Sequence, residues 1–95
     1  MSQIPGSVQA ELVKFFADLT YGGVGDWMTT FHAYDDVRAR VALPATTVGY
    51  ARGLVDVLVR HGFPVAEFVD VVLGRAPAAI RHPTLGEFFR TNRVL

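Results

Sequence analysis

Three histidines and a pair of aspartates are the residues of this chain whose types best suit catalysis or metal binding. His32, His61 and His82 lie 29 and 21 residues apart, and none has a second histidine three or four positions away, as the HExxH pattern requires. Asp35 and Asp36 are adjacent, so on a helix their carboxylates would point in different directions and would not act together as general acid and base. The spacing therefore predicts no catalytic centre and no metal site, and we expect that the chain is not an enzyme.

A glycine-rich stretch, Gly22-Gly-Val-Gly25, is the nearest feature to a phosphate-binding loop. It lacks the Lys-Ser/Thr pair that completes a P-loop, and it follows a helical pattern rather than a strand. The sequence also has no GxSxG nucleophile motif and no cysteine, which excludes disulfide and thiol chemistry. We expect no cofactor and interpret the glycines as a loop between two helices.

Composition restricts the class of protein further. The 95 residues allow a single domain, and an apolar content of 51% is too high for a disordered chain. Nine basic residues balance nine acidic ones, which argues against a nucleic-acid coat or a polybasic membrane anchor. No uncharged apolar stretch is long enough to span a bilayer, and the N-terminus does not resemble a signal peptide, so we expect a cytoplasmic protein.

Apolar residues recur with the period of a helix along most of the chain. The pattern, with its start and stop signals, predicts six helices at about residues 8–20, 26–33, 35–42, 47–61, 64–73 and 84–91. The predicted fold class is all-α, a single domain over residues 1–95 with five to six antiparallel helices in a compact bundle. A competing α/β interpretation rests on two short β-branched runs, residues 55–59 and 68–72.

Capping residues and aromatic residues place these helices more closely. Residues able to accept hydrogen bonds from a helix's first turn precede five of them: Ser7, Asp26, Asp35 or Asp36, Thr46 or Thr47, and Thr84, the last with Glu87 in a capping box. Pro64 suits the first position of the fifth helix, and Gly62 suits the left-handed position after the fourth. The residues assigned to the core are Trp27, Phe31, Phe68, Phe88 and Phe89.

The longest predicted helix has a narrow polar strip formed by Arg52, Asp56 and Arg60, with Gly49 and Gly53 beside it. The two glycines are either tolerated in the helix or leave bare backbone that a partner can approach. A tight turn over residues 43–46 precedes this helix, so a small helix-turn-helix DNA-binding regulator is the alternative function. A recognition helix is usually basic, whereas this strip alternates in sign, so nucleic acid is not the favoured partner.

Charge is distributed unevenly along the chain. Residues 1–36 hold five acidic residues against Lys14 alone, whereas residues 37–95 hold eight arginines against four acidic residues. If these segments separate in space, the acidic patch of one copy can dock on the basic patch of another. The candidate interface residues are Asp18, Asp26, Asp35, Asp36, Arg75, Arg81, Arg90 and Arg93, with Arg52 and Arg60 as a second strip. The alternative is that helix packing mixes the charges and leaves no patch.

Six short helices with a long apolar fourth resemble the death-domain superfamily. Three runs, residues 36–41, 51–62 and 67–77, are similar to bacterial effector-associated and death-like domains. The chain departs from that pattern in the Gly22–Gly25 loop, in Trp27 and in the segment from Thr84 to Leu95. The resemblance implies a protein–protein interaction module, an adaptor that recruits effectors in bacterial defence or conflict signalling. Its expected partner is another protein or a copy of itself, rather than a small molecule or a membrane.

Overall fold

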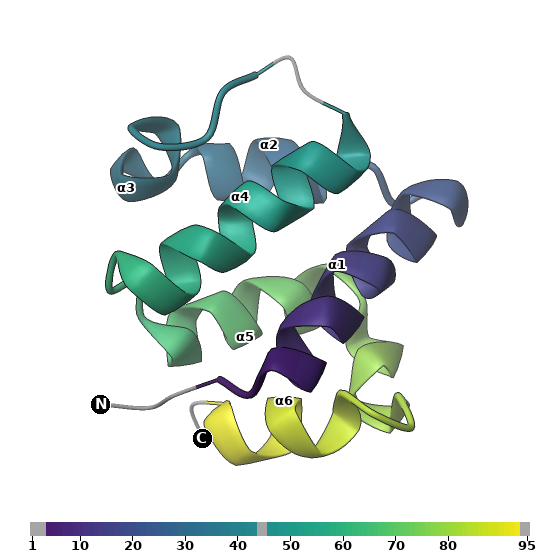
Figure 1. Cartoon of the computed structure of the whole chain (residues 1–95). Coiled ribbons are helices and arrows are strands. Elements are labelled where there is room, and N and C mark those ends of the chain that lie inside the picture. Colours follow the sequence, from purple (N-terminus) through teal and green to yellow (C-terminus); the bar gives the residue numbers. More distant parts are fainter. Residues whose placement is uncertain (1–3, 44–45, 94–95) are drawn as a thin grey trace.

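The computed structural model describes residues 4–43 and 46–93. This part of the chain forms six α-helices and one 3-10 helix: α1 (Gly6–Tyr21), α2 (Trp27–His32), α3 (Asp35–Arg38), α4 (Thr47–Arg60), α5 (Val65–Arg75), η1 (Pro77–Arg81) and α6 (Gly86–Asn92) (Figure 1). None of the described residues lies in a strand, so the all-α prediction is confirmed. The α/β interpretation is wrong, because its two β-branched runs lie within α4 and α5.

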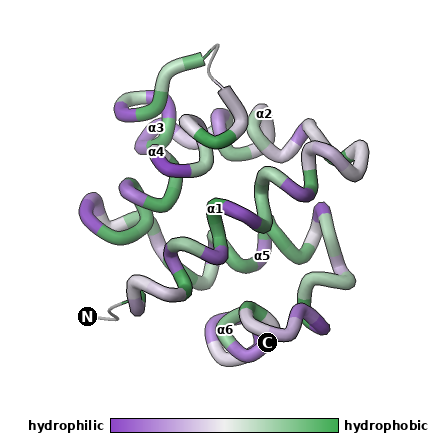
Figure 2. Tube along the Cα trace, turned by 45° about the vertical axis from the view of Figure 1, so that its right-hand side comes forward, coloured by the Kyte–Doolittle hydropathy of each residue, from purple (hydrophilic) through white to green (hydrophobic). Residues whose placement is uncertain are grey.

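The helices pack into a compact bundle with a radius of gyration of 12.1 Å, close to the roughly 12 Å expected for a folded chain of this length. α1 packs along α4, α2 contacts α3 and α5, and α6 packs against η1 and α5. α3 and α6 lie at opposite ends of the molecule (Figure 1). In Figure 2 the apolar stretches run through the middle of the bundle, and the hydrophilic ones gather at its turns and outer sides.

An aromatic cluster joins α1, α2 and α5 at the centre of the core. The ring of Phe16 stacks on Trp27 at a centroid distance of 4.3 Å and meets Phe31 and Phe68 edge-on. All four side chains are buried, and the indole of Trp27 donates a hydrogen bond to Thr20 Oγ1 at 3.0 Å. Such aromatic pairs each add about 0.5–1.5 kcal/mol to the burial of their apolar area. The predicted core positions of Trp27, Phe31 and Phe68 are confirmed.

A buried tyrosine ties α4 to α2. The hydroxyl of Tyr50 donates to the carbonyl oxygen of Met28 at 3.1 Å, and Nδ1 of His32 lies 3.1 Å from the same hydroxyl. Because the hydroxyl proton is used on Met28, His32 must donate through Nδ1–H. Burial raises the pKa of Tyr50 to about 12. His32, one of the three histidines considered for catalysis or metal binding, therefore makes a structural contact.

The start of α1 and both ends of α4 show where the capping predictions succeed and fail. Thr46, one of the two threonines predicted as the cap, precedes α4, and its side chain accepts a hydrogen bond from the Gly49 amide at 3.0 Å. Gly62 has a φ of 76°, which confirms its left-handed position. Ser7 does not cap α1, which begins one residue earlier. The carbonyl of Pro5 accepts hydrogen bonds from the first turn instead.

The start of α6 also differs from the prediction. The helix begins at Gly86, and neither Thr84 nor Glu87 caps it through a side chain, so the predicted capping box is wrong. Instead, Nδ1 of His82 accepts hydrogen bonds from the backbone amides of Thr84 at 3.1 Å and Leu85 at 3.0 Å, in the turn that leads into the helix, and the His82 carbonyl oxygen accepts from the Gly86 amide at 2.9 Å. A histidine Nδ1 can accept these hydrogen bonds only when it carries no proton.

Asp26 and Asp35, two of the predicted caps, instead form ion pairs with Arg75 and Arg38. Asp26 precedes α2 but makes no side-chain hydrogen bond to its first turn, and Asp35 and Asp36 lie inside the first turn of α3. α3 ends at Arg38, four residues before the predicted end, and Val41 beyond it is buried against Gly53 of α4. Pro64 stands just before α5 rather than at its first position.

The C-terminal aromatic residues are only partly placed as predicted. Phe89 is fully buried and contacts Phe15 of α1 at a centroid distance of 5.8 Å. Phe88 is only partly buried, because it faces a cavity between α6 and the start of α1. The core assignment of Phe89 is therefore confirmed, and that of Phe88 is corrected to the edge of the core.

Candidate functional site

An ion pair joins the acidic and basic segments of the chain within one molecule. Oδ2 of Asp26 lies 2.9 Å from Nη1 of Arg75, which connects the start of α2 to the end of α5. Asp35 pairs with Arg38 within α3. Two of the four acidic interface candidates thus have a cation beside them in their own chain. Both pairs are exposed, and such pairs contribute at most about 1 kcal/mol, so an external partner can compete for them.

The other two acidic candidates, Asp18 and Asp36, are exposed on α1 and α3. Within residues 4–43 and 46–93, neither lies within ion-pair distance of a cation. Asp18 borders a cavity of about 360 Å³ whose other lining residues are Phe15, Leu19, Gly22, Val24 and His82. These two carboxylates are therefore available to an external cation.

The structure adds two carboxylates that the sequence analysis left out of the acidic set. Partial burial raises the pKa of Tyr34, and the charges of Glu67 and Asp70 on α5 raise it further. These groups therefore lie close to the residue that precedes α3. No sequence signal brings position 34 to positions 67 and 70, because their proximity depends on the packing of α5 against α2.

Three of the predicted basic residues lie on η1, on α6 and directly after α6. Arg81, Arg90 and Arg93 are exposed, and no acidic side chain of the described residues lies within ion-pair distance of them. Nη1 of Arg90 donates to the carbonyl oxygen of Ile80 at 2.8 Å, which holds α6 against η1. This end of the molecule lies away from α3 (Figure 1). We refer to these three residues as the basic end.

In the polar strip of α4, Arg52 and Arg60 are exposed and Asp56 is partly exposed. Nε of Arg60 lies 3.0 Å from Oδ1 of Asp56, and Nε2 of His61 lies 3.6 Å from Oδ2 of the same carboxylate. Arg52 has no such partner among the described residues. The turn before α4 includes residues 44 and 45, which lie outside the described residues, so the helix-turn-helix geometry stays a prediction.

The two glycines of this helix have neighbours in their own chain. A Cβ on Gly53 would lie 3.1 Å from a methyl group of Val41, so this glycine lets Val41 pack closely on α4. A Cβ on Gly49 would lie 2.8 Å from Oγ1 of Thr46, the residue that caps the helix. Gly53 is therefore explained by internal packing, whereas Gly49 also remains exposed to solvent.

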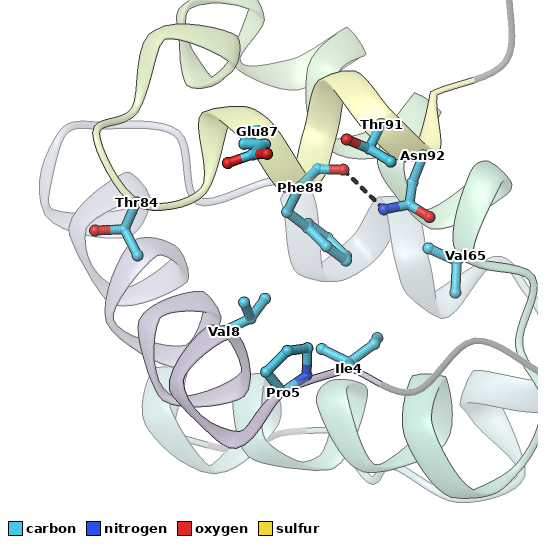
Figure 3. Close-up of a pocket in the computed structure, with 9 residues that line it drawn as sticks. All are labelled: Ile4, Pro5, Val8, Val65, Thr84, Glu87, Phe88, Thr91 and Asn92. Carbon is cyan, nitrogen blue, oxygen red and sulfur yellow. Dashed lines mark hydrogen bonds between the residues drawn. The ribbon is translucent and has the colours of Figure 1, made fainter.

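Two further cavities flank the first turns of α1. One, of about 300 Å³, lies between α1 and α6; its lining residues are Ile4, Pro5, Val8, Val65, Thr84, Glu87, Phe88, Thr91 and Asn92. Figure 3 shows the Phe88 ring pointing from α6 toward Ile4 and Pro5, with Asn92 donating to the Phe88 carbonyl oxygen at 2.9 Å. The other, of about 310 Å³, lies between α1 and α4 and is bordered by the polar strip.

No family model, curated protein or solved structure matches this chain. Among the described residues, no group of three or more histidine, aspartate or glutamate side chains is placed to hold a metal ion. No helix in that part of the chain is long and apolar enough to cross a membrane.

Proposed function

We propose that this chain is a protein–protein interaction module, an adaptor that docks through oppositely charged surfaces on a second copy of itself or on another protein. The observation that supports the proposal is the basic end, where Arg81, Arg90 and Arg93 are exposed without an acidic partner among the described residues. Charged surfaces of this kind speed association and fix the orientation of docking. The proposal assigns no catalytic role to the chain.

The complementary surface is supplied by exposed carboxylates on other elements. Asp18 and Asp36 have no cation beside them in the described chain, and Glu67 and Asp70 add charge near Tyr34. Each molecule thus presents both signs on different elements. A contact between unlike surfaces is heterologous and continues into rings or open assemblies.

The resemblance to death-like domains supports the finer parts of the same proposal. These parts are a death-like arrangement of the helices, recruitment of effectors in bacterial defence signalling, and a cytoplasmic location. The alternative, DNA binding through α4, is less well supported, because Asp56 lies in the middle of the strip and would repel phosphates.

The test is self-association of the chain at low salt over rising concentration. The variant Arg81→Glu/Arg93→Glu reverses two charges of the basic end and leaves Arg90 to hold α6 on η1. We expect it to weaken association by at least about tenfold, and we expect high salt to weaken the wild-type association, since the Debye length falls from about 10 Å at 0.1 M to about 3 Å at 1 M. The matched control, Lys14→Glu/Arg40→Glu, changes the net charge equally outside η1 and α6 and should not weaken it.

A mixture of two charge-reversed chains tests whether the two surfaces contact each other. A chain carrying Asp18→Arg/Asp36→Arg should show the same loss of association as the Arg81→Glu/Arg93→Glu chain, whereas a mixture of the two chains should recover it, because reversing both surfaces restores their complementarity. Association that is insensitive to these reversals would place the interface elsewhere. A chain that stays monomeric and retains no protein partner on an affinity column counts against the proposal as a whole.

A further inference from the structure

The outer face of α4 combines exposed apolar and charged side chains in one stripe. At 100° per residue its members fall within an arc of about 120°; they are Val48, Arg52, Asp56, Val59 and Arg60. Val48 and Val59 are 41% and 39% exposed, and they are two of the four large apolar side chains that are exposed in the described chain. Two exposed valines on one helix face, with charges between them, leave apolar area that a partner can cover.

The charges of this face complement themselves when the helix is turned end for end. Arg52 and Asp56 are opposite in sign and four residues apart, equally spaced about Leu54. When a second α4 lies antiparallel across this point, Arg52 faces the second copy's Asp56, and Asp56 faces the second copy's Arg52. Each ion pair therefore occurs twice, as in any isologous contact. The carboxylate of Asp56 already lies beside Arg60 through Oδ1 and His61 through Oδ2, and its remaining lone pairs can accept one further guanidinium.

The same register also places an apolar side chain against bare backbone. Val59 then faces Gly49 of the second copy, which is exposed and has no Cβ to hold the two helices apart. The cavity of about 310 Å³ between α1 and α4 borders this face, and Val13 and Val55 supply apolar surface there. Side chains of a second helix can enter this cavity. The ion pairs and the apolar contact therefore form in the same register.

We propose that two copies of this chain form a symmetric dimer through antiparallel α4 helices, with a two-fold axis near Leu54. This inference rests on the interaction role proposed above and adds a second, isologous contact between copies, separate from heterologous docking through the basic end. The alternation of sign that makes the strip unsuitable for phosphates is the property that makes it complementary to itself.

The test compares three variants of the exposed strip: Arg52→Asp, Asp56→Arg, and both changes in one chain. Each single change places like charges at both copies of the ion pair, because the two-fold axis repeats it, so we expect the dimer Kd to rise by at least about tenfold. The double variant exchanges the two signs and should recover the dimer. Sedimentation equilibrium at chain concentrations up to roughly 1 mM measures the dimer Kd even where association is weak.

Two controls separate the interface from folding and from net charge. Circular dichroism should show that every variant stays helical, since Arg52 is exposed and the Asp56 side chain is 45% exposed. Arg40→Asp removes the same charge as Arg52→Asp from an exposed position outside α4 and should leave Kd unchanged.

A wild-type chain that remains monomeric over this range overturns the dimer, as does a double variant that fails to recover association lost in both single variants. Association that the α4 variants leave intact but Arg81→Glu/Arg93→Glu abolishes also overturns the α4 dimer. That last result leaves docking through the basic end in place, so the two proposals fail separately.

Discussion

His82 provides a test of how α6 is anchored to the bundle. Its Nδ1 accepts hydrogen bonds from the amides of Thr84 and Leu85, and its ring meets Phe15 edge-on at a centroid distance of 5.9 Å. The substitution His82→Ala removes both contacts at once. The amides of the turn that leads into α6 then lose their side-chain acceptor, and the aromatic contact to α1 is lost as well.

The expected loss follows from these two contacts. Removal of an N-terminal cap costs about 0.5–2 kcal/mol, and removal of an edge-on aromatic pair costs about 0.5–1.5 kcal/mol. We therefore expect His82→Ala to lower the free energy of unfolding by about 2 kcal/mol. For a domain of this size that corresponds to a fall in Tm of roughly 8–16 °C.

Thermal and urea denaturation followed by circular dichroism measure this loss. His82→Asn places Oδ1 at the position of Nδ1, so it should recover about 1 kcal/mol by restoring the cap without the ring. Thr84→Ala is the matched control and should change stability by less than about 0.5 kcal/mol, because the exposed Thr84 side chain caps nothing. A costly Thr84→Ala together with a neutral His82→Ala would refute the reasoning and favour a conventional capping box.

Two glycines and one tyrosine give further predictions. Gly86→Ala should destabilise the fold by about 1–3 kcal/mol, because its Cβ would lie 2.6 Å from the Ile80 carbonyl oxygen; Gly74→Ala, with open space around it in α5, should stabilise the fold by up to about 1 kcal/mol. Equal signs in thermal denaturation would contradict this pair. The pKa of Tyr50 is raised by burial from 10.0 to about 12, so the stability linked to its neutral form is complete below pH 10 and is lost as the pH rises through 12. Tyr50→Phe cannot ionise, so its unfolding free energy should fall less steeply above pH 10 in alkaline denaturation, and an identical slope would exclude this linkage.

Features that depend on near neighbours in the chain could be predicted before folding was considered. The apolar period located every α-helix, because a helix buries one side with a period of 3.6 residues, and the start and stop signals placed all but one of their ends to within two residues. Thr46 and Gly62 were placed correctly because a cap and a left-handed glycine act within one turn. The exposed strip of α4 also follows from its own spacing, since residues four apart share a helix face.

Features that depend on contacts between distant residues followed from packing instead. Asp26 would have served α2 as a cap, but its carboxylate meets Arg75, 49 residues further along the chain. The sequence divides its acidic and basic residues at position 36, yet this ion pair connects the two segments, while Glu67 and Asp70 join the acidic side near Tyr34. A charge is screened over about 10 Å in solution, so its effect depends on which helices pack beside it rather than on its position along the chain.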